Sequence, residues 1–384
     1  MNTTVNSIFR EYAAEFCNTH YVSGHSKKVI RAISNCRTKE LGGRVHQCDN
    51  CGDTVILYNS CRNRHCPQCQ FMKKEQWAID RQNEILPFQY FHVVFTIPEI
   101  LNPVVCRNKK LIYKLLFDAS KETLLTVSED EKFFGAKIGF FSILHTWGHK
   151  LNLHPHIHAV VPGGGYVPEQ NKWIRSPKDY LVPVKVLNKR FRSLFLTGLK
   201  KLYALHLLDL KNSTYCVSEN FQSLIDALFK IEWIVYIKES FKNSDSVIRY
   251  LSKYTHRIAI SNHRIISVKD RIVKFSYKDY RDENKKKTID MPVMTFMKKF
   301  MQHIVPKRFV RIRYYGLLSN STKSKEVKKC REYFAVKKNN PDIKSWQDIY
   351  QLITGSDISR CKKCETGKLF LVEMLPAEHT RGGP

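Results

Sequence analysis

The stretch HPHIHAVV, residues 154–161, decides the fold class and supplies the first candidate site. Successive side chains of a β-strand point to opposite faces, so this stretch separates into a polar and an apolar face. One face carries His154, His156, His158 and Val160, and the other carries Pro155, Ile157, Ala159 and Val161. We therefore expect a strand that packs its apolar face on a core and presents its histidines to a site.

The paired histidines of this strand fit a metal ion. His156 and His158 stand at i and i+2, roughly 6–7 Å apart at the backbone, a span that one cation can bridge. His145, on the preceding expected strand, is the first candidate for a third ligand, ahead of His154 and His149. Neutral imidazoles leave the charge of the cation available to polarise a phosphate. The alternative is a polar strand face whose histidines form ordinary hydrogen bonds.

The residues around this strand predict an α+β fold. Stretches rich in β-branched and aromatic residues predict strands, and apolar residues at helical spacing predict helices. The expected strands are 91–98, 137–147, 154–161, 233–240 and 308–315, with two or three short strands within 263–290. The expected helices are 103–126, 188–208 and 292–303. A short polar turn joins 137–147 to 154–161, which favours an antiparallel pair.

Charge indicates a polyanionic partner. The 384 residues carry 64 Lys and Arg against 35 Asp and Glu, a formal net charge of +29. Counterion release then favours nucleic acid, with a merely basic surface as the alternative. The N-terminus lacks a signal peptide and no stretch has the length of a membrane span, so we expect a cytoplasmic protein associated with the nucleoid.

A block of cysteines predicts a structural zinc site. Cys48 and Cys51 form one CxxC pair, and Cys66 and Cys69 form another. Two such pairs supply four thiolates, which complete a tetrahedral site and leave no open position for catalysis.

The remaining cysteines leave two possibilities open. Cys36, His46, Cys61 and His65 could build a second zinc site. Near the C-terminus, Cys361 and Cys364 supply only two ligands, so they are either half of a site completed elsewhere or a chance pair.

The sequence RYLSKYTHR supplies a candidate nucleophile. Tyr250 and Tyr254 stand at i and i+4, on one face of an expected helix. Such a pair is usually part of a core, but the cations Lys253 and Arg257 are unusual neighbours for a core face. A phenol with a pKa near 10 needs this kind of activation to attack a phosphate.

Several arginines are candidates for binding the nucleic-acid backbone. Arg62 and Arg64 lie in the cysteine block, and Arg311 and Arg313 stand at i and i+2 on an expected strand. We expect these four, together with Lys253 and Arg257 beside the tyrosines, to bind phosphate, with ordinary surface charge as the alternative for Arg311 and Arg313.

Taken in chain order, these motifs resemble the rolling-circle two-tyrosine transposases of the insertion-sequence-91 family, within the HUH endonuclease superfamily. SCRNRHCPQCQ is similar to the zinc-binding region of that family, LHTWGHKLNLHPHIHAVVPGGG to its histidine region, and YLSKYTHRIAISN to its tyrosine motif. The resemblance implies that Tyr250 and Tyr254 are nucleophiles and that His156 and His158 hold a catalytic divalent cation, Mg²⁺ or Mn²⁺. It further implies an enzyme that nicks and rejoins single-stranded DNA at the ends of its own mobile element.

The resemblance also implies an architecture, an HUH-type antiparallel sheet with flanking helices. We expect a small helical zinc-binding, DNA-docking domain at 1–85, the nuclease core at 86–320, and a basic tail with the last CxxC pair at 321–384. The competing functions are a rolling-circle replication initiator or relaxase-like nickase, and a non-catalytic zinc-dependent DNA-binding protein.

Overall fold

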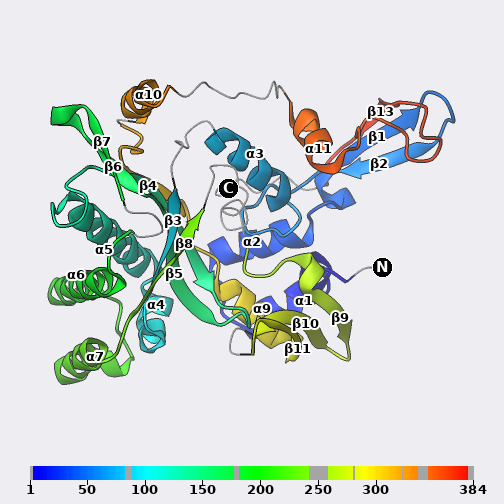
Figure 1. The fold of residues 1–384 in the computed structure, drawn as a ribbon. Helices are drawn as coiled ribbons and strands as arrows, with labels where there is room; N and C mark the ends of the chain where they lie inside the picture. The colour runs from blue at the N-terminus through cyan, green and yellow to red at the C-terminus, as the bar shows by residue number, and fades with distance from the viewer. Residues whose placement is uncertain are drawn as a thin grey trace.

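A five-stranded antiparallel sheet lies at the centre of the molecule (Figure 1). The computed structural model describes residues 3–82, 89–176, 181–241, 258–279, 282–321, 323–335 and 345–378. The strand order is β12-β4-β5-β3-β8. Its strands are β3 (Tyr90–Thr96), β4 (Gly139–Trp147), β5 (Leu153–Pro162), β8 (Ile234–Phe241) and β12 (Ile312–Gly316). All five expected strands are confirmed, with β12 shorter than expected, and so is the α+β class.

The pairing of β4 with β5 determines which side chains share a face. The strands are antiparallel, and His145 lies directly opposite His156. Directly opposed residues of such a pair point to the same side of the sheet. The histidines of both strands therefore gather on one face, and Ile157 and Ala159 are fully buried in the core on the other.

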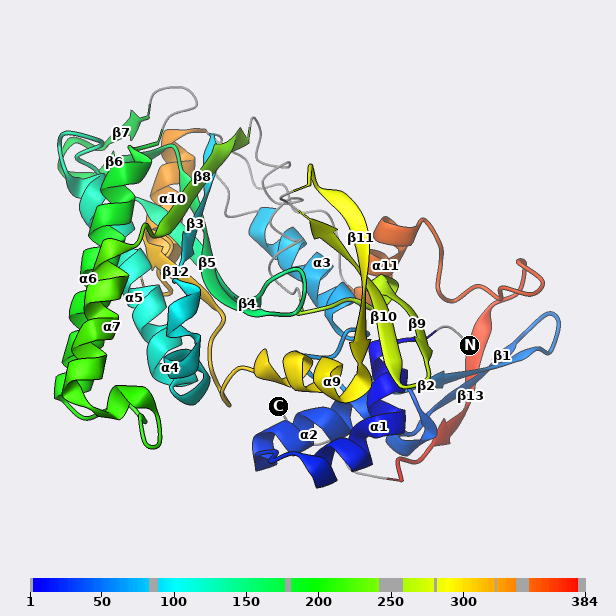
Figure 2. The same cartoon turned by 90° about the horizontal axis from the view of Figure 1, so that it is seen from below.

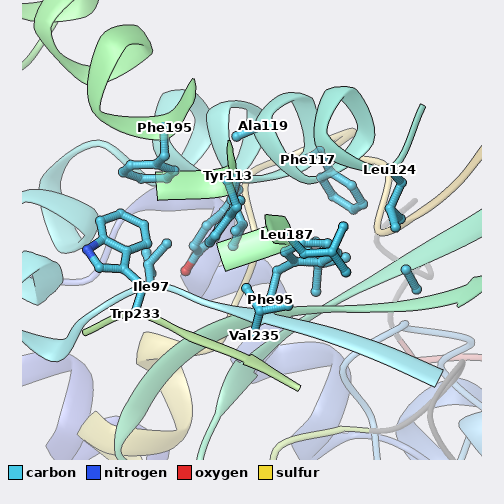
Figure 3. Close-up of a cluster of buried hydrophobic side chains, with 14 of the residues drawn as sticks. Phe95, Ile97, Tyr113, Phe117, Ala119, Leu124, Leu187, Phe195, Trp233 and Val235 are labelled. Carbon is cyan, nitrogen blue, oxygen red and sulfur yellow. The ribbon is translucent and has the colours of Figure 1, made fainter. Parts of the chain in front are cut away.

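Four helices cover the apolar face of this sheet (Figure 1). They are α4 (Asn102–Arg107), α5 (Lys109–Glu129), α6 (Val184–Ala204) and α7 (Ser218–Lys230). Figure 3 shows aromatic side chains of α5 and α6 lying over strand residues, with Tyr113, Phe117 and Phe195 above Phe95. Burying such rings is worth roughly 1.5–3 kcal/mol each, so this is the main stabilising core.

The expected helix 103–126 is two helices. Asn108 has φ −116° and ψ 33°, outside the helical region, and separates α4 from α5. Its side-chain amide donates to the carbonyl of Val104, and its side-chain oxygen accepts from the backbone N–H of Asp209 at 2.7 Å. A residue that hydrogen-bonds locally in this way competes with the helix, which explains the break.

The N-terminal helices form a second core with elements that come much later in the sequence. The elements involved are α1 (Val5–Thr19), α2 (Gly24–Ser34), β9 (Ile265–Lys269), β10 (Ile272–Asp279), β11 (Lys285–Pro292) and α9 (Val293–Gln302). Phe9 of α1 meets Phe300 of α9 edge to face at 5.0 Å, and Figure 2 shows these helices side by side. Trp147 at the end of β4 belongs to this core as well. Described residues of 258–279 and 282–305 therefore pack on the N-terminal helices, across the domain boundary expected near residue 85.

A three-stranded sheet joins the two ends of the chain. Its order is β13-β1-β2, formed by β1 (Gly43–Cys48), β2 (Thr54–Tyr58) and β13 (Leu369–Leu375). Figure 1 shows the C-terminal strand β13, in red, beside the N-terminal strands in blue. Within the basic tail expected at 321–384, β13 pairs antiparallel with β1 and so lies against the N-terminal part of the chain.

The remaining elements lie at the periphery. They are α3 (Gln70–Gln82), the hairpin of β6 (Gly164–Val167) and β7 (Lys172–Arg175), α10 (Lys323–Tyr333) and α11 (Trp346–Thr354). Trp77 of α3 packs against Phe141 of β4 on the histidine face of the central sheet. None of the helices that the structure describes has the length and apolar character needed to cross a membrane.

Candidate metal centre and nucleic-acid interface

Three histidines converge on one face of the central sheet, opposite the face that the helices cover. His145 comes from β4, and His156 and His158 come from β5. One ring nitrogen from each lies within 4.8 Å of the other two. His145 and His158 are buried, and His156 is half-buried. Three imidazoles at this spacing can bind one divalent cation, and His154 and His149 do not join the group.

The hydrogen bonds of the β5 histidines favour coordination through Nε2. Nδ1 of His156 lies 2.6 Å from the carbonyl oxygen of His154, an acceptor that requires the proton on Nδ1. A ring protonated at Nδ1 carries its lone pair on Nε2, which is the nitrogen that a cation takes. The backbone of the same strand thus fixes the tautomer of one candidate ligand.

A fourth histidine, His92 on β3, fixes the tautomer of His158 through a similar hydrogen bond. Its Nε2 lies 2.7 Å from Nδ1 of His158, and the two rings stack at 4.9 Å. Burial, and to a lesser extent the charge of Lys238, lowers the pKa of His92 to about 4, so the ring is neutral and its Nε2 can accept a hydrogen bond from Nδ1 of His158. Sequence reasoning missed His92, because its place beside His158 depends on the pairing of β3 with β5.

Trp147 links the histidine cluster to a small positively charged pocket. Its ring stacks on that of His145, with centroids 4.5 Å apart. The pocket beside it is lined by His65, His303 and Arg311, together with apolar residues that include Ile258. Burial lowers the pKa of Arg311 to about 10, and the nearby charge of Arg64 contributes. A buried guanidinium beside a second one creates a potential that favours an anion.

The predicted nucleophiles Tyr250 and Tyr254, with Lys253 and Arg257, lie outside the described residues. The described chain resumes at Ile258, which lines the same pocket as Trp147. The segment that carries both tyrosines is therefore followed directly by a residue on the histidine side of the sheet.

The arginines are arranged differently from the expectation that all four face phosphate. Only Arg62 is exposed. Arg64 donates a 2.7 Å hydrogen bond to the carbonyl of Phe309, so it is used in holding the cysteine block to the core. Arg311 lines the pocket, and Arg313 stacks 4.2 Å above the ring of Phe117 on the opposite, helix-covered face. Arg311 precedes β12, which begins at Ile312, so the alternation of a strand does not place the two arginines on one face as the i, i+2 spacing had suggested.

The cysteines form two groups of four rather than the single group expected. Cys66 and Cys69 lie with Cys36 and Cys61, with all four sulfurs within 4.8 Å of one another. The sulfur of Cys69 is 3.5 Å from that of Cys36 and 3.6 Å from that of Cys61. These distances fit the edges of a tetrahedral zinc–thiolate site, about 3.8 Å for Zn–S bonds of about 2.3 Å.

The other expected pair, Cys48 and Cys51, lies in a second group with Cys361 and Cys364. The predicted set of Cys48, Cys51, Cys66 and Cys69 is wrong for a geometric reason. The β1–β2 hairpin carries Cys48 and Cys51 at its turn, whereas Cys36 and Cys61 flank its open end, about 16 Å away for five residues of strand. The histidines of the hypothetical second site are in neither group among the described residues, since His65 lines the pocket and His46 lies within β1.

Two protein families match parts of this chain. Residues 139–325 match the family described as "Putative transposase", and residues 8–97 match that described as "Transposase zinc-binding domain". "Putative transposase y4qJ" of Sinorhizobium fredii (strain NBRC 101917 / NGR234) is 40% identical over 378 residues, covering 97% of this chain and 95% of its own.

A second relative, "Transposase for insertion sequence element IS801" of Pseudomonas savastanoi pv. phaseolicola, is 28% identical over 345 residues, which cover 88% of this chain and 81% of its own. No solved structure matches. In this chain the matched zinc-binding range precedes the matched transposase range, which contains the three clustered histidines. The chain belongs to the transposase family of insertion sequence 91, and its cluster of Cys36, Cys61, Cys66 and Cys69 lies within the matched zinc-binding transposase domain.

Proposed function

We propose that this transposase nicks and rejoins single-stranded DNA at the ends of its mobile element through a 5′-phosphotyrosine intermediate. Tyr250 and Tyr254 are the nucleophiles, and His145, His156 and His158 hold the divalent cation. The observation that carries the proposal is the convergence of three imidazoles on the sheet face beside the point where the tyrosine segment ends.

The donor set suits a catalytic cation. Three neutral nitrogen ligands leave coordination positions open, unlike a site closed by four thiolates. Imidazole suits Mn²⁺ better than Mg²⁺, which prefers oxygen, so we expect Mn²⁺ to bind more tightly at equal concentration. When bound, the cation withdraws electron density from the oxygens of the scissile phosphate.

The protein residues perform the remaining steps. The phenol oxygen of one tyrosine attacks phosphorus and loses its proton, the bond from phosphorus to the 3′ oxygen breaks, and the released 3′-hydroxyl takes up a proton. The phosphodiester is conserved as a tyrosine ester, so a later 3′-hydroxyl can reverse the reaction and join strands. A second tyrosine at i+4 permits a second transfer before the DNA is released.

The surrounding charge favours DNA over other substrates. Arg311 and Arg64 create a positive potential beside Trp147. The net charge of +29 adds long-range attraction for a polyanion.

The test is formation of a covalent adduct. Single-stranded DNA from an element end, labelled on the 3′ side of the nick, is incubated with the protein and Mn²⁺ or Mg²⁺ and separated on a denaturing gel. Tyr250→Phe combined with Tyr254→Phe should abolish the labelled protein band while single-strand binding remains. Tyr21→Phe is the matched control, because this tyrosine is 98% exposed and far from the cluster in sequence.

His156→Ala should abolish metal-dependent nicking. Persistent adducts in the double tyrosine variant would refute the nucleophiles, and unchanged nicking in His156→Ala would refute the metal site. Strand-specific binding without any adduct in the unaltered protein would instead favour a non-catalytic DNA-binding protein.

A further inference from the structure

We propose that Cys48, Cys51, Cys361 and Cys364 bind a second structural zinc ion, which joins the two ends of the chain. Cys361 and Cys364 lie outside both sequence ranges that match family models, 8–97 and 139–325. This site is separate from the cluster of Cys36, Cys61, Cys66 and Cys69, and it does not depend on the proposed strand-transfer chemistry.

The sulfur positions fit a tetrahedral metal site. All four sulfurs lie within 4.8 Å of one another. Cys48 is 3.6 Å from Cys364, and Cys51 is 3.7 Å from Cys361, sulfur to sulfur. Tetrahedral zinc with Zn–S bonds of about 2.3 Å requires about 3.8 Å, whereas a disulfide requires about 2.05 Å.

The backbone around the C-terminal pair is shaped to present thiolates. The N–H of Lys363 points to the sulfur of Cys361 at 3.4 Å, and the N–H of Gly367 points to that of Cys364 at 3.3 Å. Such N–H groups stabilise the negative charge of a metal-bound thiolate. Gly367 is also required sterically, since a Cβ there would lie 2.4 Å from the sulfur of Cys48.

The rest of the contact between the two pairs is polar and exposed. Asp49 accepts from the backbone N–H of Lys368 at 2.8 Å, and Lys363 pairs with Asp53 at 2.9 Å. Exposed ion pairs of this kind contribute about 0–1 kcal/mol each. These contacts align the two turns, but they are too weak to hold the chain ends together.

Strand β13 has little apolar burial with which to stay in place. Phe370, Val372 and Met374 are each about half exposed, at 47%, 50% and 58%. The β1–β2 hairpin without it would be a two-stranded sheet, which is marginal in water. A zinc–thiolate site contributes folding free energy directly, so the metal is the component that makes β13 the third strand.

The first test is zinc content. Purified full-length protein should contain two zinc ions per chain by atomic emission. Cys361→Ser combined with Cys364→Ser should contain one, and it should lose residues 345–378 first under limited proteolysis. Cys106→Ser combined with Cys216→Ser is the matched control, because both residues are exposed and belong to neither cluster, and it should keep two.

A second test needs no variant and so holds even if the double serine protein fails to fold. Thiol titration of the unaltered protein in denaturant with chelator should detect all 12 cysteines. Four fewer thiols would mean that the cluster is two disulfides. Any of three results would overturn the proposal: those two disulfides, a single zinc ion in the unaltered protein, or two zinc ions in the variant that combines Cys361→Ser with Cys364→Ser. DNA nicking is not a readout in either test, so failure of the proposed function is seen separately.

Discussion

His303 should make the free energy of unfolding fall at acidic pH, and the substitution His303→Gln should remove this effect. The ring is buried between two elements, with Nδ1 3.3 Å from the hydroxyl of Thr146 and Nε2 3.3 Å from the carbonyl oxygen of Leu151. The neutral ring satisfies both contacts by accepting from the hydroxyl and donating to the carbonyl. Burial, and more weakly the charges of Lys109 and Lys299, lowers its pKa to about 3.

The direction of this pH dependence follows from the pKa of His303 in the folded and in the unfolded chain. The unfolded chain has a histidine pKa of about 6.5, above the folded value, so the unfolded state takes up the proton first. The stability contribution is fully present above about pH 6.5 and is lost as the pH falls from there toward 3. At about 1.4 kcal/mol per pH unit, lowering the pH from 7 to 5 costs about 2 kcal/mol.

The assay is urea unfolding at pH 7 and pH 5 for the unaltered protein and for His303→Gln, both loaded with zinc. Glutamine keeps a donor and an acceptor but does not titrate. The loss of unfolding free energy between the two pH values should be about 2 kcal/mol smaller in the variant. Protonation of zinc-bound thiolates and of His92 affects both proteins equally and cancels. An equal loss in the two proteins would refute this reasoning about His303.

Three further sets of substitutions test the site and the fold. His92→Phe removes the partner of His158 and should weaken Mn²⁺ binding in calorimetric titration by roughly 10- to 100-fold at unchanged zinc content; unchanged affinity would contradict the role of His92. Gly316→Ala places a Cβ at φ +58°, 1.9 Å from a backbone oxygen, and should lower the stability measured by thermal unfolding by about 2 kcal/mol. Gly24→Ala is the control: it has open space around it and should be nearly neutral. Arg313→Ala should lower stability by about 1 kcal/mol and leave the salt dependence of DNA binding unchanged, since its charge lies over aromatic rings. Arg62→Ala should reduce the slope of log binding affinity against log salt concentration by about one. If Arg313→Ala instead reduced this slope and Arg62→Ala did not, Arg313 would bind phosphate, as the sequence had suggested.

The central sheet could be predicted from the sequence because its signal is local. The alternation in 154–161 alone separates the histidine face from the core face, and the structure has that separation. His145 could be ranked ahead of His154 and His149 because a short turn pairs its strand with β5. The partner His92 required the register of β3 against β5, which the composition of either strand does not specify.

The cysteine grouping could not be predicted because it depends on a long-range strand pairing. Spacing alone makes Cys48, Cys51, Cys66 and Cys69 the natural set of four. The hairpin of β1 and β2 moves the first pair away from the second, and β13 brings Cys361 and Cys364 across 310 residues to Cys51 and its neighbours. The apolar pattern of β13 is mostly exposed, so nothing in its own sequence indicates which strand it pairs with.

The place of β13 in the sheet has a consequence for biosynthesis. Chains fold from the N-terminus as they leave the ribosome, so β1 and β2 emerge first and β13 emerges last. Throughout translation the nascent protein therefore exposes one unpaired edge of β1 and the two thiols at its turn. Prematurely terminated products keep that open edge for good, which makes them candidates for aggregation and quality control, whereas the finished polypeptide covers it.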